Sequence, residues 1–371
     1  MIDQIKLINK KIGGFPEEPH YLVGNKKIYN WVEAFEAAEK LTTSNDPNEM
    51  WHHLNFRFGM EVKGQEPKET IRELYIQRAK QIRQQFKYVR LWVSGGTDST
   101  NTIQTFINAG VAPDELATYY QWPGSPTTDT NPELITLAAY LDQKKIRDLW
   151  PNCKIQTYYM FPDQINWYMK NHIKHYLGTR SLFLFSQCFH NIFECYPKML
   201  TEHGTSIVEL FSGPEGIDIG RDEKGWYYNF VDKSFNLHSL APNQRFFHTD
   251  PQNPELLLKI VHICKKAYQE ANGLNMGHMS FQLKNLSGMQ YYLSKDRIYD
   301  IQNKDQKGLY WGTKSFTRIQ NMFASEIGFD SLMRMMSLYK ELQDNHSHWF
   351  HDKQITNSFI GQKSQRVYFE D

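Results

Sequence analysis

Several features that would place a protein in a familiar class are scarce or missing in this sequence. Its 371 residues include four cysteines, Cys153, Cys188, Cys195 and Cys264, and no C-x-x-C pair; this predicts reduced thiols rather than a disulfide framework. No run approaches the roughly 18 apolar residues of a membrane span, and the polar N-terminus does not resemble a signal peptide. We therefore expect a soluble, cytoplasmic protein that does not act at a membrane.

An excess of charge of one sign is also missing. Lys and Arg number 42, Asp and Glu number 41, and the formal net charge is +1. A protein that coats nucleic acids in general needs a large positive excess to displace counterions from phosphates, so the balance argues against that class. A local basic groove is compatible with it, and a nucleic-acid substrate stays open.

What is present is an alternation of short apolar runs with helical patterns. Strands that alternate with helices at this spacing predict βαβ units, and therefore an α/β fold with a parallel sheet covered by helices on both faces. The predicted strands are Tyr88–Val93, Glu115–Gln121, Lys154–Met160 and Ser206–Phe211, and the predicted helices between and after them are Ser99–Ala109, Thr130–Trp150, Asp163–His175 and Ser181–Glu202.

The two ends of the chain are predicted to be mostly helical. Helical spacing of apolar residues occurs around residues 31–41 and 68–88, and again over 253–272 and 316–343. We therefore expect three units: an N-terminal helical region over 1–85, an α/β domain over 86–235 and a C-terminal helical region over 236–371.

The segment Ser94-Gly95-Gly96-Thr97-Asp98-Ser99-Thr100, between the first strand and its helix, carries the clearest chemical pattern. The first N–H groups of a helix have no internal partner and favour an anion. Gly95 and Gly96 let the backbone approach phosphate oxygens, and the hydroxyls of Ser94, Ser99 and Thr100 add donors. Asp98 would repel phosphate unless a cation such as Mg²⁺ bridges the two.

The alternative is an ordinary strand-to-helix turn in which Asp98 or Ser99 caps the helix. The complete pattern S-G-G-x-D-S, directly after a strand and directly before a helix, favours phosphate binding. It is not a Walker A loop, because G-x-x-x-x-G-K-[ST] occurs nowhere in the chain.

This pattern resembles the signature of PP-loop ATP pyrophosphatases, a family that includes asparagine synthetase, GMP synthetase, NAD synthetase and several tRNA-modifying enzymes. The resemblance covers roughly residues 70–235. It implies a Rossmann-like fold of the adenine nucleotide alpha hydrolase type, ATP and Mg²⁺ as cofactors, and cleavage of ATP to AMP and pyrophosphate. The loop Ser94–Ser99 would then hold the β- and γ-phosphates, and adenine would lie against the second strand, which includes Tyr119.

A second glycine-rich segment, Gly213-Pro214-Glu215-Gly216-Ile217-Asp218, follows the fourth predicted strand. It is similar in composition to an acidic loop that asparagine-synthetase-like members carry near the phosphates and metal. The usual consecutive acidic pair is here split into Glu215 and Asp218. Two interpretations stay open: a glycine turn with solvated carboxylates, or a loop in which Gly213 borders the nucleotide and Glu215 or Asp218 binds Mg²⁺ or orients a substrate amine.

Attack on the α-phosphorus develops negative charge that a cation could stabilise. Arg180, just before a predicted helix, and Lys307, in a basic stretch with glycines, are the candidates, and a solvated surface charge is the alternative for each. The spacing of His346, His348 and His351 could ligate a metal, although exposed loop residues show the same pattern.

The leading hypothesis is an AMP-forming, C–N bond-forming ligase similar to the synthase domain of asparagine synthetase. ATP would activate a carboxyl or carbonyl oxygen, an amine or ammonia would displace AMP, and the C-terminal region would contribute to the acceptor pocket. Position 2 is Ile2, where the family's glutaminase domain has a cysteine, so nitrogen would come from ammonia, an amine or a separate protein. The alternatives are a PP-loop enzyme that modifies a nucleotide or a tRNA or DNA base, and a nucleotide-binding protein without turnover.

Overall fold

In the computed structural model, the described part of the chain comprises residues 20–29, 31–46, 49–57, 61–93, 95, 97–121, 132–160, 206–211, 217–230, 244–248, 250, 253–271, 341, 344–349 and 363–370. Three sheets are present in it: one parallel sheet of five strands and two antiparallel sheets of three strands each. No helix within these ranges is long and apolar enough to cross a membrane.

The parallel sheet has the strand order β10-β7-β4-β5-β6. If its five strands are numbered along the chain and read from the β6 edge, this order is 3-2-1-4-5, the arrangement of doubly wound nucleotide-binding folds. The predicted α/β, Rossmann-like fold is therefore confirmed, and so are the four predicted strands. Their observed bounds are β4 (Tyr88–Trp92), β5 (Glu115–Gln121), β6 (Lys154–Met160) and β7 (Ile207–Phe211).

The fifth strand, β10 (Gln244–Phe246), was not predicted from the sequence. It pairs with β7 in parallel and so extends the sheet past residue 235, where the sequence predicts that the alternation ends. Its three residues, Gln-Arg-Phe, are too few and too polar to show a strand period.

The helices of this region follow the predictions closely, with one correction. α4 (Ile71–Gln85) begins with a capping box between Thr70 and Glu73, and α5 (Thr97–Ala109) ends at Gly110. The single helix predicted over 130–150 is wrong, because two helices are present, α6 (Pro132–Gln143) and α7 (Ile146–Leu149). The break lies at Lys145, which adopts a left-handed conformation with φ 49° although neither Gly nor Pro marks it in the sequence.

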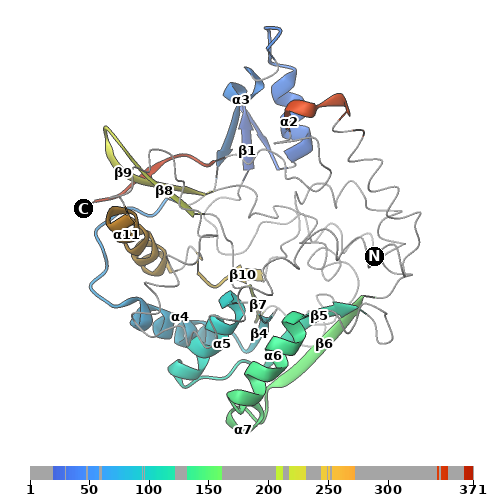
Figure 1. The fold of residues 1–371 in the computed structure, drawn as a ribbon, viewed down its shortest axis with the longest axis vertical. Helices are drawn as coiled ribbons and strands as arrows, with labels where there is room; N and C mark the ends of the chain where they lie inside the picture. Colours follow the sequence, from blue (N-terminus) through green and yellow to red (C-terminus); the bar gives the residue numbers. More distant parts are fainter. Residues whose placement is uncertain are drawn as a thin grey trace.

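Neighbouring helices of the α/β region contact one another. The hydroxyl of Tyr140 on α6 lies 3.2 Å from the backbone oxygen of Thr100 and 3.3 Å from the amide oxygen of Gln104, both on α5. α5 also packs beside α4. In Figure 1, α4, α5 and α6 follow one another along the parallel sheet. The helices predicted over 163–175, 181–202 and 316–343 lie outside the described residues or almost entirely so.

The N-terminal region contains a sheet that the sequence did not predict. The strands β1 (His20–Val23), β2 (Lys26–Ile28) and β3 (Leu54–Arg57) form an antiparallel sheet beside the helices α2 (Trp31–Glu39) and α3 (Met50–His53). Helix α2 was expected from its apolar spacing, but strands of three or four residues are too short to show a period of two. The division of the chain into three units stays a prediction.

A further antiparallel sheet and a long helix make up most of the remaining described chain. β8 (Ile217–Asp222), β9 (Gly225–Phe230) and β11 (Val367–Tyr368) form the second antiparallel sheet, and α11 (Pro254–Ala271) packs against β8 and α4. Figure 1 shows β8, β9 and α11 on the left, between the N-terminal sheet above and the parallel sheet below.

The centre of the parallel sheet contains a buried group of charges. Arg90 on β4 lies directly opposite Glu115 on β5 and Glu209 on β7 in the strand register. Its guanidinium nitrogens are 2.9 Å from a carboxylate oxygen of each, and all three side chains are at most 5 % exposed. Tyr88 and Tyr158 donate hydrogen bonds of 2.7 Å to the two oxygens of Glu115. One cation thus holds two carboxylates in the core.

We expect Arg90→Met to destabilise the protein strongly, because it leaves two buried carboxylates without their cation. The expected loss in the free energy of unfolding is about 3–5 kcal/mol, measured by urea denaturation. Arg366→Met is the matched control, since the ion pair of Arg366 with Asp222 is 53 % exposed on the arginine side and such pairs contribute at most about 1 kcal/mol.

The double variant Arg90→Met/Glu209→Met should recover part of the loss, because Glu115 keeps its two tyrosine donors. Equal losses in Arg90→Met and Arg366→Met would show that the buried group does not stabilise the sheet.

Candidate functional site

The candidate site lies where the order of the parallel strands reverses. β4 continues through α5 to β5 on one side, whereas its neighbour on the other side is β7, which comes much later in the chain. In open α/β sheets, ligands bind outside the carboxyl ends of the strands at this reversal point. β4 leads into residues 94–96 and β7 leads into residues 212–216, so both glycine-rich segments singled out in the sequence leave neighbouring strands at the same edge.

The strand register shows that residues 94–96 and residues 212–216 follow strands that end at the same level of the sheet. Leu91 pairs with Leu210, and the rings of the next residues, Trp92 and Phe211, stack with centroids 6.2 Å apart and planes 7° from parallel. The carboxyl ends of β4 and β7 are thus fixed side by side by backbone pairing and by an aromatic contact. Residues that follow them start from adjacent points.

Gly95 supplies the turn between β4 and α5. It is buried and has φ 79°, a left-handed conformation that glycine adopts without the clash of a Cβ atom. α5 begins two residues later, at Thr97, so the N–H groups of its first turn, which have no acceptor within the helix itself, lie directly after this turn. A left-handed glycine directly before the start of a helix is compatible with a phosphate-binding strand-to-helix loop.

The side chains that follow are polar although they are buried. Ser99 is 5 % exposed, and Thr102 and Thr105 are 2 % exposed. Asn101 is 1 % exposed, and neither atom of its amide has a hydrogen-bond partner within the described part of the chain. Because a buried amide without a partner costs about 1–3 kcal/mol, Asn101 is a functional candidate that the sequence did not indicate: asparagine in a helix usually faces solvent.

The other predicted site residues are placed only in part. Ser94, Gly96, Gly213, Glu215, Arg180 and Lys307 lie outside the described residues. For Thr97 and Asp98 the backbone is described, in the first turn of α5, and for Asp218 the backbone on β8, opposite Asn229. The backbone of Tyr119 lies on β5 opposite Tyr158. The roles assigned to these side chains stay predictions.

The described histidines of the segment that was considered as a metal site contact a carboxylate of the N-terminal region. His346 and His348 both approach the carboxylate of Glu39 on α2, with N–O distances of 3.0 and 2.7 Å, and the Trp349 indole donates to it at 2.9 Å. His351 lies outside the described residues. Within the described ranges no group of three or more His, Cys, Asp or Glu side chains is arranged to hold a metal ion. These histidines connect residues 346–349 to the N-terminal region.

Comparison with known proteins gives little beyond a distant likeness of shape. No family model matches the sequence, and no curated protein matches it. Among solved structures, the structure of NMN synthetase from Francisella tularensis is similar over 75 % of this chain and 96 % of that chain, with 9 % sequence identity and a TM-score of 0.29. A TM-score this low says nothing about function.

Gly95→Ala should weaken anion binding at the loop, because the added Cβ disfavours the left-handed turn that Gly95 adopts with φ 79°. Calorimetric titration with tripolyphosphate should show binding at least about tenfold weaker than in the unsubstituted protein. The expected cost in stability is about 1–2 kcal/mol.

Gly110→Ala is the matched control at the other end of the same helix. Gly110 also has a positive φ, 67°, and nothing lies within 4 Å of an added Cβ, so it should cost similar stability and leave anion affinity unchanged. Equal affinities in both variants would argue against an anion site at Gly95.

Proposed function

We propose that this chain is a PP-loop enzyme that cleaves ATP to AMP and pyrophosphate in order to form a C–N bond. The observation that carries the proposal is the complete S-G-G-x-D-S segment at the reversal point of a doubly wound parallel sheet, with Gly95 in a left-handed turn. A composition near electroneutrality fits a small-molecule enzyme better than a protein that coats nucleic acids.

The residues of the loop fit a polyphosphate. The turn at Gly95 and the first N–H groups of α5 offer donors that need no side chain. Asp98 in the first turn supplies a carboxylate oxygen, the ligand type that Mg²⁺ prefers. We assign Mg²⁺ to Asp98, with Glu215 or Asp218 as a further ligand; when bound it would neutralise charge on the phosphates.

The proposed reaction has two steps. An oxygen of the substrate's carboxyl or carbonyl group bonds to the α-phosphorus while the bond from that phosphorus to the bridging oxygen breaks, and pyrophosphate leaves from the loop. An amine or ammonia then attacks the activated carbon, gives up a proton and displaces AMP. Arg180 and Lys307 are our candidates for stabilising the charge that develops at the α-phosphorus. Tyr119 would border the adenine and Gly213 the phosphates.

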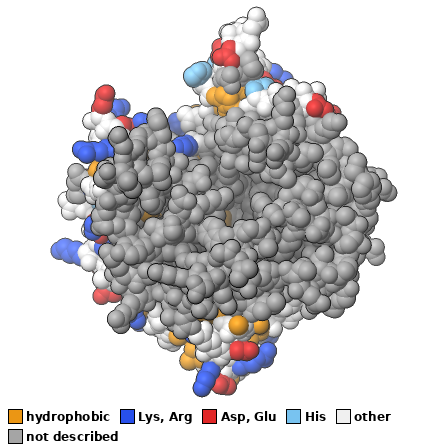
Figure 2. Space-filling model, viewed as in Figure 1, with side chains coloured by type: hydrophobic (Ala, Val, Ile, Leu, Met, Phe, Trp, Pro, Cys, Tyr) orange, Lys and Arg blue, Asp and Glu red, His pale blue; other side chains and the backbone are white. Residues whose placement is uncertain are grey.

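The distribution of surface charge bears on the choice between a small molecule and a nucleic acid as acceptor. On the face shown in Figure 2, the described side chains lie at the margins, and there Lys and Arg are interspersed with Asp and Glu. These described side chains do not gather into a large field of one sign. We therefore keep the small-molecule acceptor as the proposal, with ammonia, an amine or a separate donor protein as the source of nitrogen.

Asp98→Ala should abolish AMP formation. Purified protein is incubated with Mg²⁺, α-labelled ATP and a cell extract divided into a small-molecule fraction and an RNA fraction, and AMP is separated from ADP. We expect AMP and pyrophosphate with the small-molecule fraction and a decrease of at least about 100-fold in Asp98→Ala. Asp142→Ala, which removes an exposed aspartate from α6, should retain full activity.

The pattern of products decides between the hypotheses. AMP formed with the RNA fraction alone would replace the proposal by a nucleic-acid-modifying enzyme. ADP as the product, or ATP binding without turnover in any fraction, would exclude the ligase.

A further inference from the structure

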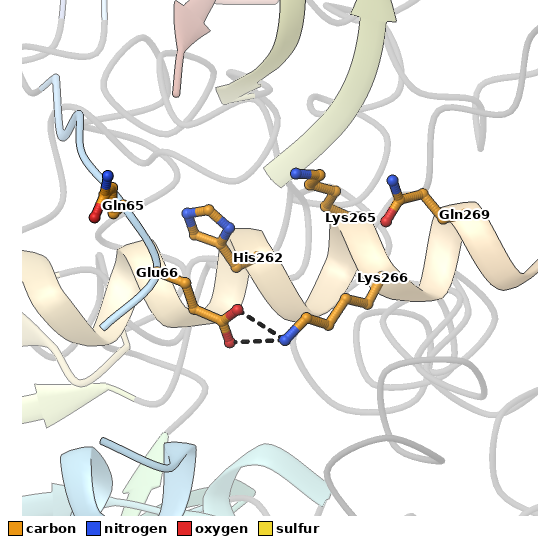
Figure 3. A pocket seen from close by; sticks show the side chains of 6 residues that line it. All are labelled: Gln65, Glu66, His262, Lys265, Lys266 and Gln269. Carbon is orange, nitrogen blue, oxygen red and sulfur yellow. Dashed lines mark hydrogen bonds and ion pairs between the residues drawn. The ribbon is translucent and has the colours of Figure 1, made fainter. Parts of the chain in front are cut away.

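Polar groups at the surface differ in whether they already have partners. A cavity of about 380 Å³ lies between α11 and the extended segment 61–67, and Figure 3 shows Glu66 of the segment pointing at Lys266 of the helix. Glu66 lies 2.7 Å from Lys266 and 2.7 Å from Lys259, so these ion pairs connect the segment to the helix. The outer edge of the parallel sheet is different, because it presents backbone groups without described partners.

The strand β6 forms that edge. It is the last strand in the order β10-β7-β4-β5-β6, and no other strand than β5 pairs with it within the described ranges. In Figure 1 it lies at the outer border of the sheet. Lys154, Ile155 and Gln156 are all exposed, although successive side chains of a strand point to opposite faces. Both faces of the sheet are therefore open at this edge.

The strand carries few of the features that protect a sheet edge. Natural edges are blunted by proline, bulges or charged side chains. β6 has the sequence KIQTYYM, with one charge at its first position, and its register with β5 contains no bulge. Ile155 is 37 % exposed, and Leu149 on α7, shortly before the strand, is 48 % exposed. A long exposed edge of this kind is a template for pairing with another strand.

The direction of the backbone groups follows from the pairing with β5. The Lys154 N–H donates to the Asp114 carbonyl at 2.9 Å, and along a strand the groups of successive residues point to alternate sides. The N–H and C=O groups of Ile155, Thr157 and Tyr159 therefore point away from the sheet.

These outward groups are only partly occupied. The carbonyl of Thr157 accepts a 2.8 Å hydrogen bond from the exposed Gln156 side chain. The N–H groups of Ile155 and Thr157 have no protein partner within the described part of the chain. A neighbouring strand would satisfy donors and acceptors together, in place of the Gln156 contact and of water.

We propose that two copies of this chain pair through β6 in an antiparallel manner, across a two-fold axis at Thr157. Thr157 then lies opposite the partner's Thr157 and Ile155 opposite the partner's Tyr159, so the outward residues form hydrogen-bonded pairs. Pairs of threonines are favourable across antiparallel strands. Lys154 comes opposite the partner's Met160, and along the strand no like charges meet.

A second copy fits this edge because the pattern is its own complement under a two-fold rotation, the commonest symmetry of oligomers. A net charge of +1 gives little repulsion between copies. One strand from each copy, about 23 Å long, buries less than the roughly 1,200 Å² at which standard stable interfaces begin. The dimer is therefore weak, with an expected Kd of about 10–100 µM.

Sedimentation velocity on the full chain, from about 1 to 200 µM, measures this association. Thr157→Lys and Thr157→Glu each bring like charges together at the axis and should weaken the dimer about tenfold or more. An equimolar mixture of the two variants should restore it, because the introduced lysine then faces the introduced glutamate. The same two substitutions at Thr43, an exposed residue of the N-terminal region, should leave the association unchanged.

Thermal melts of the Thr157 variants accompany this experiment, because Thr157 is only partly exposed. A protein that is monomeric at every concentration overturns the proposal, and so does a dimer that is equally strong in both Thr157 variants. A mixture that stays monomeric, although each variant melts like the unsubstituted protein, overturns it as well.

Hydrogen exchange followed by NMR tests the same pairing without any substitution. The outward amides of Ile155 and Thr157 should exchange more slowly as the concentration rises through the Kd, whereas the Gln156 amide, which points to β5, should not change. Exchange that is independent of concentration at Ile155 and Thr157 would contradict the pairing. Neither measurement involves ATP, and a failure here leaves the proposed ligase activity untouched.

Discussion

The placement of Arg90 between Glu115 and Glu209 is the constraint on which the parallel sheet depends. These three residues are direct neighbours across β5, β4 and β7, and burial makes any mismatch among them costly. In a strand, a shift of one residue turns every side chain to the other face. Such a shift in β4 would turn Arg90 away from both carboxylates and put the apolar side chain of Val89 or Leu91 between them, although all three residues are buried. The charges therefore select one register for three strands.

That register is what gives the candidate site its geometry. With β4 and β7 aligned, the chain leaves both strands at the same level of the sheet, and the loop with Gly95 starts beside the end of β7 at Phe211. A second buried ion pair, between Arg78 on α4 and Asp250 after β10, connects the helix before β4 to the far edge of the sheet. The contact of Tyr140 with the backbone of Thr100 holds α6 against the first turns of α5. Pairing of charges and polar groups thus positions the loop, and apolar packing surrounds them.

How much of this could be predicted from the sequence depends on whether a feature is local. The runs that became β4 to β7 and the loop between β4 and α5 are continuous in sequence, so period and motif indicated them. The partners of Arg90 lie 25 and 119 positions further along the chain, and only the register brings them together. The three-residue strand β10 exists because β7 offers it an edge, and the break at Lys145 has no residue that marks it. Gly95 could be predicted as a turn, but the burial of Asn101 could not.

The phosphate loop and the lysines of α11 differ in the origin of their polar contacts, and this explains why the sequence indicated only one of them. At Gly95 the proposed anion site depends on backbone N–H groups at the start of a helix, which a glycine motif indicates. On α11 the pattern His-x-x-Lys-Lys-x-x-Gln is indistinguishable in sequence from an ordinary solvated helix face. What distinguishes it is the segment 61–67, which lies nearly 200 positions earlier and whose Glu66 binds Lys259 and Lys266. A contact between segments this far apart depends on the fold, so no local pattern in the sequence indicates it.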